Sequence, residues 1–472
     1  MSGPHLALIS PYDAGNLGDA AILESVSNGF RALDPSCRFT AVTLAPAAMP
    51  DCHGFPGWPI TGASVAFYAI AESARQAPAS AVADFAVTSS VGSETPARRR
   101  SFAARLGRLP VLGPLLKRLR SAVRFAIADL RHWRRSHAWL ADVDGVMVAG
   151  GGQFDDEWGG AWGHPYALFK WSVLAGMRGI PFVIASVGVC RTHDRLARFF
   201  FARAMRNAQL LTFRDAESRV RAAAIQPKCP GGVVSDLAFA LDPAFAIHPA
   251  LKCGAACEVP GDTAQPVFAG SASRATGTGS RLRIGLSPIA YRMPDAWPTP
   301  DAARFREYFD VLLGLVRSLR EAGHEVVLFT SERTDRDVVR LVQQRLVAEG
   351  AQPLESVLPD RLEELLAALD CFDVVITSRL HGIILAHVLG KPAAALSYDR
   401  KVREHMKDMG QESYCLDIDS PELANAWAMT QQLIAARASA AASVRAALAP
   451  RRAQVVEQYA HILRMLRRGD RG

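Results

Sequence analysis

The sequence predicts an α/β protein with two doubly wound domains that face a cleft, followed by a C-terminal helix. Short runs of β-branched and other apolar residues alternate with segments whose apolar residues recur at helical spacing, and both halves of the chain show this alternation. A stretch of small and polar residues without periodicity separates the halves. Strands that alternate with helices form mainly parallel sheets, so each half is expected to be a layered, Rossmann-like domain.

The N-terminal domain is predicted to occupy residues 1–250, and its first strand, residues 5–10, leads to a helix that Asp19 is placed to cap. Residues 251–282 are expected to be a linker, residues 283–420 the second domain, and residues 421–472 a helical segment. Further strands are predicted at 39–44, 145–149, 181–187, 210–213, 283–288, 325–330, 373–377 and 393–397, and helices at 166–178, 196–207, 301–322, 335–348, 361–369 and 383–389.

The composition is globular, with 49% hydrophobic and 21% charged residues, which excludes a mainly disordered or fibrous protein. The net charge of +8 is local, because residues 98–135 carry +11 and the rest of the chain −3. No nucleic-acid module is recognisable around this segment, so nucleic acid is not an expected partner. The eight cysteines form no CxxC pair, and neither a membrane span nor a signal peptide is recognisable. A cytoplasmic location is therefore expected.

An insertion at residues 54–140 interrupts the first domain, and its second part is the basic segment. On a helical wheel its apolar residues fall within about a 100° sector, with most basic residues outside it. These apolar positions are Leu112, Leu116, Leu119, Val123, Ala126, Ile127 and Leu130. One interpretation is a helix that lies on an anionic membrane surface, giving peripheral contact through residues 98–135 at the inner face of the membrane. The alternative is a helix packed on the domain with a solvated basic face.

The most informative cluster is TSRLHG at residues 377–382, between a predicted strand and a predicted helix. The N–H groups and positive dipole end at such a turn attract an anion. The planar guanidinium of Arg379 can bind a carboxylate or phosphate through two hydrogen bonds, and the imidazole of His381 can exchange protons near neutral pH. The alternative is structural, with Arg379 in a salt bridge and His381 capping the turn.

Three more polar groups follow predicted strands. The turn GNLGD at residues 15–19 offers Asn16 and Asp19 beside two glycines that let a ligand approach the backbone. Arg214 and Lys401 each follow a strand and could contact an anion. A capped turn, a salt bridge of Arg214 to a neighbouring acid, and a surface lysine are the structural alternatives.

The glycine-rich turn GGGQFDD at residues 150–156 also follows a buried strand. Its glycines, among them Gly151 and Gly152, can form an anion-binding nest or a closely packed turn. Asp155 and Asp156 are candidate bases for deprotonating a hydroxyl. The turn does not have the spacing of a P-loop.

Together these motifs resemble the polysaccharide pyruvyl transferase family over about residues 1–50 and 141–415, whereas the insertion has no counterpart recognised in that family. The matching segments are GNLGDAAI (15–22), VAGGGQFDD (148–156), the strand end at 186–188, FRDAES (213–218), SDLAFAL (235–241), TSRLHGIILAHVLGKP (377–392) and SYDRKV (397–402). The combination of the last two segments is the most specific.

The resemblance implies a glycosyltransferase-B-like fold and transfer of the pyruvyl group of phosphoenolpyruvate to two hydroxyls of a sugar, giving a pyruvate ketal. It implies that Arg379, Leu380 and His381 contact phosphoenolpyruvate, with Arg214 as a second arginine. His381 would protonate the donor at C3. The acceptor would be a sugar in a polysaccharide or a lipid-linked oligosaccharide.

The base would be Asp155, Asp156 or Asp19, and neither a metal nor a cofactor is expected. Two other functions fit the sequence. One is a nucleotide-sugar-dependent glycosyltransferase of the same two-domain architecture, which has less need for an arginine and a histidine at 377–382. The other is a non-catalytic, membrane-peripheral scaffold.

Overall fold

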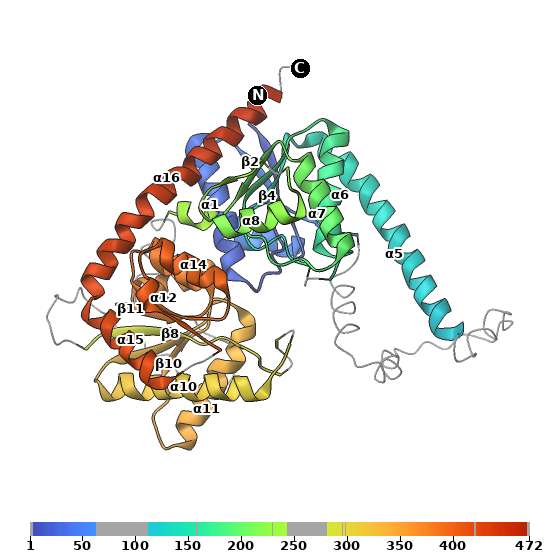
Figure 1. The fold of residues 1–472 in the computed structure, drawn as a ribbon. Helices are drawn as coiled ribbons and strands as arrows, with labels where there is room; N and C mark the ends of the chain where they lie inside the picture. The colour runs from blue at the N-terminus through green and yellow to red at the C-terminus, as the bar shows by residue number, and fades with distance from the viewer. Residues whose placement is uncertain are drawn as a thin grey trace.

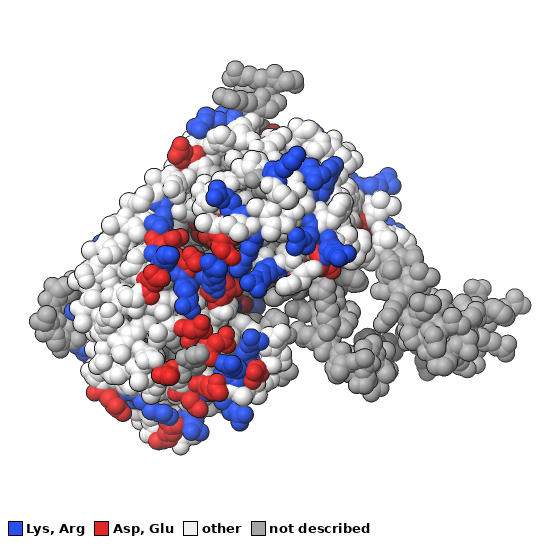
Figure 2. Space-filling model, in the orientation of Figure 1, with Lys and Arg blue, Asp and Glu red and all other residues white. Residues whose placement is uncertain are grey.

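The computed structural model describes residues 3–62, 112–156, 159–228, 230–242, 281–294, 296–297, 299–419 and 422–469, without the side chains of residues 112–123 and 468–469. The described residues form two parallel β-sheets, one in each half of the chain, with helices packed against them (Figure 1). This confirms the predicted α/β class. On the face drawn in Figure 2, basic and acidic side chains are interspersed rather than gathered into a field of one sign.

The first sheet has seven strands in the order β3-β2-β1-β4-β5-β6-β7, and its neighbouring strands pair in parallel. The strands are β1 (His5–Ile9), β2 (Arg38–Thr43), β3 (Gly57–Pro59), β4 (Gly145–Ala149), β5 (Phe182–Val187), β6 (Leu210–Phe213) and β7 (Gly232–Val233). The helices are α1 (Leu17–Leu33), α2 (Met49–His53), α5 (Leu112–Trp139), α6 (His164–Arg178), α7 (Arg195–Asn207) and α8 (Ala216–Ile225), with the short helix η3 (Leu237–Ala240).

The second sheet has six strands in the order β10-β9-β8-β11-β12-β13. The strands are β8 (Arg283–Ser287), β9 (Glu325–Phe329), β10 (Glu355–Val357), β11 (Val374–Thr377), β12 (Ala393–Ser397) and β13 (Cys415–Asp417). The helices are α10 (Ala302–Glu321), α11 (Arg336–Ala348), α12 (Leu362–Asp370), α13 (Leu380–Val388), α14 (Arg400–Asp408), α15 (Leu423–Ala435) and α16 (Arg437–Gly469).

Both sheets reverse their winding direction at the centre, between β1 and β4 in the first and between β8 and β11 in the second. Loops at such a switch point diverge and leave room for a ligand at the carboxyl ends of the strands. The loops after β1, β4 and β11 contain three of the predicted clusters. The topology therefore places those clusters where this type of sheet binds ligands.

The long helix α16 returns from the second domain to the first and packs along α1 (Figure 1). The ring of Tyr459 lies 5.0 Å from that of Phe30, and Gln458 accepts a 2.6 Å hydrogen bond from Thr212. One hydrophobic core joins α1 and η3 of the first domain to α13 of the second and to α16. The predicted C-terminal helical segment thus connects the two domains.

Candidate functional site

The predicted turns at 15–19 and 377–382 meet where the two domains touch. The amide of Leu17 donates a hydrogen bond to the Ser331 carbonyl, and that of Arg333 donates to the Gly15 carbonyl, each at 3.2 Å. Asn16 and Glu332 form an antiparallel bridge between these segments. The start of α1 is thus bonded to the loop that follows β9, beside the start of α13.

Asn16 caps α1, which corrects the expectation that Asp19 does so. The Oδ1 atom of Asn16 accepts hydrogen bonds from the amides of Gly18 at 2.9 Å and Asp19 at 3.3 Å. The helix begins at Leu17, so Asp19 lies in its first turn rather than at the capping position. Capping by the side chain of Asn16 releases the carboxyl group of Asp19 from that task.

The carboxyl group of Asp19 has a pKa raised to about 7. Burial is the largest cause, and the nearby carboxylates of Asp13, Glu332 and Asp236 raise the pKa further. Asp19 also faces the loop after β4, because a Cβ added to Gly151 would lie 3.4 Å from its Oδ1 atom. A carboxyl group with this pKa can both accept and release a proton at neutral pH.

Gly18 allows the two domains to approach at the site. A Cβ on Gly18 would lie 2.1 Å from Nδ1 of His381, so any side chain there would displace the imidazole or separate the domains. By contrast, a Cβ on Gly152 would meet nothing within 4 Å. The glycine turn predicted from the sequence thus accommodates a side chain of the other domain.

Replacing Gly18 by alanine is expected to displace His381 and, on the prediction that this histidine takes part in catalysis, to lower activity by about tenfold or more. Gly176→Ala is the matched control, since a Cβ at this helical glycine meets nothing within 4 Å. Steady-state kinetics of both variants would test this, and equal activities would show that the contact with His381 is dispensable.

His381 lies in the first turn of α13 and carries a neutral imidazole at neutral pH. Burial lowers its pKa to about 4, and the cations of Arg214, Lys401 and Arg379 lower it further, against the charge of Asp236. The Nε2 atom of His381 is buried and has no hydrogen-bond partner among the described residues. A bound anion would supply a partner for Nε2 and raise the pKa of His381.

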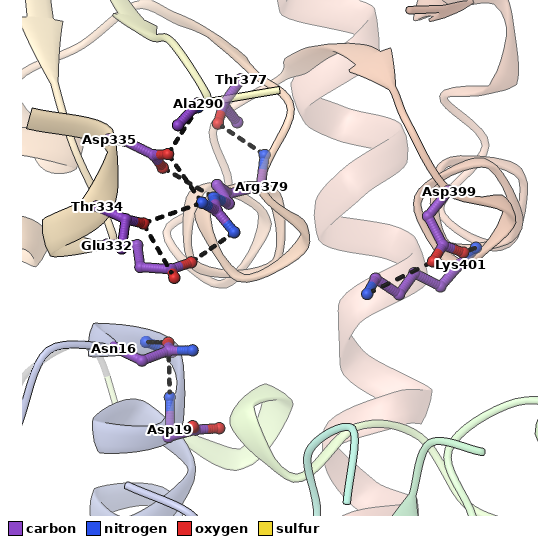
Figure 3. A network of polar contacts seen from close by, with 11 residues as sticks. Asn16, Asp19, Ala290, Glu332, Thr334, Asp335, Thr377, Arg379, Asp399 and Lys401 are labelled. Atoms are coloured by element: carbon purple, nitrogen blue, oxygen red, sulfur yellow. Dashed lines mark hydrogen bonds and ion pairs between the residues drawn. The ribbon is translucent and has the colours of Figure 1, made fainter. Parts of the chain in front are cut away.

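Arg379 occupies the N-terminal cap position of α13, and two carboxylates of its own domain hold its side chain (Figure 3). Its guanidinium donates two 2.8 Å hydrogen bonds to the carboxylate of Asp335 and forms a 2.5 Å ion pair with Glu332. Burial alone would lower the pKa of Arg379, but Asp335 and Glu332 raise it well above its usual range. The structural alternative foreseen for Arg379 is therefore present, and an incoming anion must share this guanidinium with both carboxylates.

The carboxylate of Asp335 is fully buried and also accepts a 2.9 Å hydrogen bond from the amide of Ala290. Asp335→Asn is expected to destabilise the protein by about 1–3 kcal/mol, because it weakens a charge-assisted hydrogen-bond pair. Denaturant unfolding would measure the change. The exposed acid Asp337 of α11 provides the control Asp337→Asn, which should change stability by less than about 1 kcal/mol.

Arg214 and Lys401 approach His381 from opposite domains. Arg214 is buried between Asp215, at 3.3 Å, and Asp236, at 3.6 Å. A Cβ on Gly188 would lie 2.7 Å from its guanidinium carbon. The Nζ atom of Lys401 lies 3.6 Å from Asp399; burial alone would lower the pKa of Lys401, but Tyr398 and Asp399 raise it above its usual range, against the charge of Arg214. The charges of both cations act on the buried imidazole of His381.

The remaining predicted residues have other surroundings. Asp156 accepts hydrogen bonds from the amides of His193 at 3.0 Å and Asp194 at 2.9 Å, which fixes the loop before α7. Asp155 lies near Cys190, whose thiol has a pKa raised to about 12 by burial and by the charge of Asp155. The side chain of Leu380 is buried in the shared core. Of the carboxylates named from the sequence, Asp19 has the environment best suited to a base.

Three acids that surround the predicted cations were not singled out in the sequence. Asp236 caps η3 through Oδ1, and its Oδ2 faces Arg214. Its position in the SDLAFAL motif was a usable signal. Glu332 and Asp335 lie in a charged stretch after β9 that is indistinguishable from a solvated surface loop in the sequence.

In the part of the chain that the structure describes, no group of three or more His, Cys, Asp or Glu side chains is arranged to hold a metal ion. None of the helices among the described residues combines the length and the apolar character needed to cross a membrane.

The sequence profile of the polysaccharide pyruvyl transferase family matches residues 16–400. Among solved structures, the chain is similar to HepE of Anabaena in complex with UDP and glucose, with a TM-score of 0.52, 10% identity, and coverage of 98% of this chain and 99% of HepE. It is also similar to UDP-GlcNAc 2-epimerase of Methanocaldococcus jannaschii, with a TM-score of 0.50, 10% identity, and coverage of 90% and 92%. These likenesses establish the fold. No curated protein sequence matches the chain.

Proposed function

The chain belongs to the polysaccharide pyruvyl transferase family, and we propose that it transfers the pyruvyl group of phosphoenolpyruvate to two hydroxyls of a sugar. The observation that supports this most directly is the buried imidazole of His381, which lies against Gly18 of the first domain and feels the charges of Arg214 and Lys401. Phosphoenolpyruvate carries a carboxylate and a phosphate, which call for more than one cation. Its C3 also requires a proton donor.

The reaction balances with the groups available. One acceptor hydroxyl adds to C2 of the donor as His381, protonated in the complex, delivers a proton to C3, and the methylene becomes a methyl group. Asp19 takes the proton of the attacking hydroxyl. The second hydroxyl then displaces phosphate from C2, its proton leaves with the phosphate, and the ketal ring closes.

The anionic donor would adjust the charges of the site. Arg214 and Lys401 would contact its phosphate or carboxylate, and Arg379 would contribute while it remains bound to Asp335 and Glu332. The negative charge of the donor stabilises the imidazolium form of His381, so the donor itself would recruit the proton that the reaction consumes. Asn16, Gly151 and Gly152 would border the acceptor side, next to Asp19.

Incubation of the full chain with phosphoenolpyruvate and a panel of soluble sugar acceptors tests the proposal. We expect acceptor-dependent release of phosphate, together with a pyruvate ketal whose methyl group is visible by NMR. Phosphate release that does not depend on any acceptor, or a product without a ketal, would refute the ketal chemistry.

The alternative, a nucleotide-sugar-dependent glycosyltransferase, has one observation in its favour, namely the fold shared with HepE. In the same assay, release of UDP from a UDP-sugar without consumption of phosphoenolpyruvate would support it. A non-catalytic scaffold would consume neither donor, and His381→Ala would leave its biological role intact.

A further inference from the structure

The basic helix α5 packs on the first domain through a polar and aromatic face. Lys170 of α6 forms a buried 2.8 Å ion pair with Asp129, and the Tyr166 hydroxyl donates a 2.5 Å hydrogen bond to the same carboxylate. The indole of Trp133 donates to Tyr166 at 3.0 Å. These contacts anchor the C-terminal part of α5, while its N-terminal end extends away from both sheets (Figure 1).

The face of α5 that points away from α6 is apolar and basic. The large apolar residues of the predicted stripe whose side chains are described, Ile127 and Leu130, are 46% and 63% exposed. In the helix they lie roughly opposite the buried residues Asp129, His132 and Ser136, which repeat at the spacing of a packed face. The apolar stripe is therefore unpartnered in its described part, as the membrane-surface interpretation of the sequence requires.

The charge of this exposed face is of one sign. Among the side chains described from residue 124 to the end of α5, the exposed charged residues are Arg124, Arg131, Arg134 and Arg135. The acid in this stretch, Asp129, is buried in its ion pair with Lys170. On this face Ile127 and Leu130 lie among the arginines, and none of the described α5 side chains on the face is acidic.

A group of aromatic rings lies beside the packed side of α5. Trp162 and Phe199, 54% and 58% exposed, belong to a ring cluster that reaches α5 through Tyr166. The cluster lies on α6 and α7 and on the loop before α6. Tryptophan and phenylalanine are typical of surfaces that enter the interfacial layer of a bilayer.

We propose that the exposed face of α5 (Ile127 and Leu130 with Arg124, Arg131, Arg134 and Arg135) binds an anionic lipid surface. Lipid headgroups would contact the arginines while the apolar side chains enter the acyl boundary. A symmetric contact with a second copy would bring the arginines of both copies together, and the repulsion disfavours it. A nucleic acid would give the apolar side chains no partner.

Membrane docking through α5 is independent of the proposed reaction but would affect its acceptor. Docking through α5 would hold the first domain at a membrane surface. An acceptor sugar carried on a lipid would then be concentrated near the site, which favours a lipid-linked glycan over a soluble polysaccharide as the acceptor of the proposed reaction.

Flotation of the full chain with lipid vesicles tests the proposal. We expect binding to phosphatidylcholine vesicles that contain phosphatidylglycerol, little binding to pure phosphatidylcholine, and weaker binding as salt is added. Each arginine near an anionic surface contributes about fivefold to affinity, so Arg131→Gln with Arg135→Gln should weaken binding by about 25-fold. Ile127→Ser with Leu130→Ser should also weaken vesicle binding, because it removes the apolar side chains that enter the bilayer.

Matched controls come from α11, where Val347 and Arg340 are exposed on the other domain. Val347→Ser with Arg340→Gln should leave vesicle binding unchanged. Equal binding to neutral and anionic vesicles, or unchanged binding of both α5 variants, would overturn the proposal. So would a dimer, seen by light scattering, that Ile127→Ser with Leu130→Ser dissociates while lipid binding is absent.

The two proposals fail separately. If the reaction is assigned wrongly, vesicle binding remains and phosphate release from phosphoenolpyruvate is missing. If the lipid proposal is wrong, the α5 variants and the unaltered protein behave alike on vesicles, whatever their activity on a soluble acceptor.

Discussion

His381→Ala is expected to lower turnover at least about 100-fold, because it removes the group that in the proposed reaction protonates C3 of the donor. The ring contacts Gly18 and leaves Nε2 free, so the variant loses a reacting group and little of the shared core. Thermal unfolding of the variant should therefore remain close to that of the unaltered protein. Acceptor-dependent phosphate release measures the effect on turnover.

Proton uptake gives a second, independent readout for His381. Because the pKa of His381 is about 4, its imidazole is unprotonated in the free enzyme at pH 6 to 7. Binding of the anionic donor raises this pKa, so the complex should take up a proton. Calorimetry in buffers of different ionisation enthalpy would detect that uptake. His381→Ala should abolish it even if the donor still binds.

The exposed histidine His461 on α16 provides the matched control. His461→Ala should retain normal turnover and normal proton uptake. Turnover of His381→Ala near that of the unaltered protein would remove His381 from the mechanism. Loss of turnover with unchanged proton uptake would instead assign the proton to another group.

The positions of the site loops could be predicted because they follow from local patterns. Apolar runs such as those before Gly15, Gly150 and Thr377 mark buried strands, and polar residues directly after them lie at the ligand-binding edge of a parallel sheet. The short edge strands β3, β7, β10 and β13 were missed, since two or three residues carry no measurable periodicity.

The contacts between domains could not be predicted from local patterns. Nothing near Gly18 indicates that its missing Cβ accommodates His381, which is more than 360 residues away in the chain. Likewise, Asp335 and Glu332 neutralise Arg379 through tertiary packing, and their sequence neighbourhood is that of an ordinary charged loop. For α5, the apolar spacing in the sequence predicted the helix, but it could not predict which side of the helix packs against the domain.

Asp19→Asn is expected to lower turnover by about 100-fold or more and to change the pH dependence of the reaction. In the proposed reaction Asp19 acts as a base, so turnover at saturating donor, where His381 is already protonated, should rise as the carboxyl group ionises with increasing pH. An asparagine of nearly the same shape cannot ionise. The remaining activity of the variant should therefore lack this limb of the pH profile.

Asp19→Asn should raise the stability of the fold at high pH although it lowers turnover. This combination separates a catalytic from a structural role for Asp19. A carboxyl group with a raised pKa binds its proton more tightly in the folded than in the unfolded chain. Its stabilising contribution is therefore complete below about pH 4 and is lost as pH rises toward 7. Asp19→Asn should then unfold at a higher temperature than the unaltered protein at pH 8, with a smaller difference at pH 5. A variant that is both inactive and less stable at pH 8 would show that Asp19 serves the fold, because burial of its charge would then be favourable rather than costly.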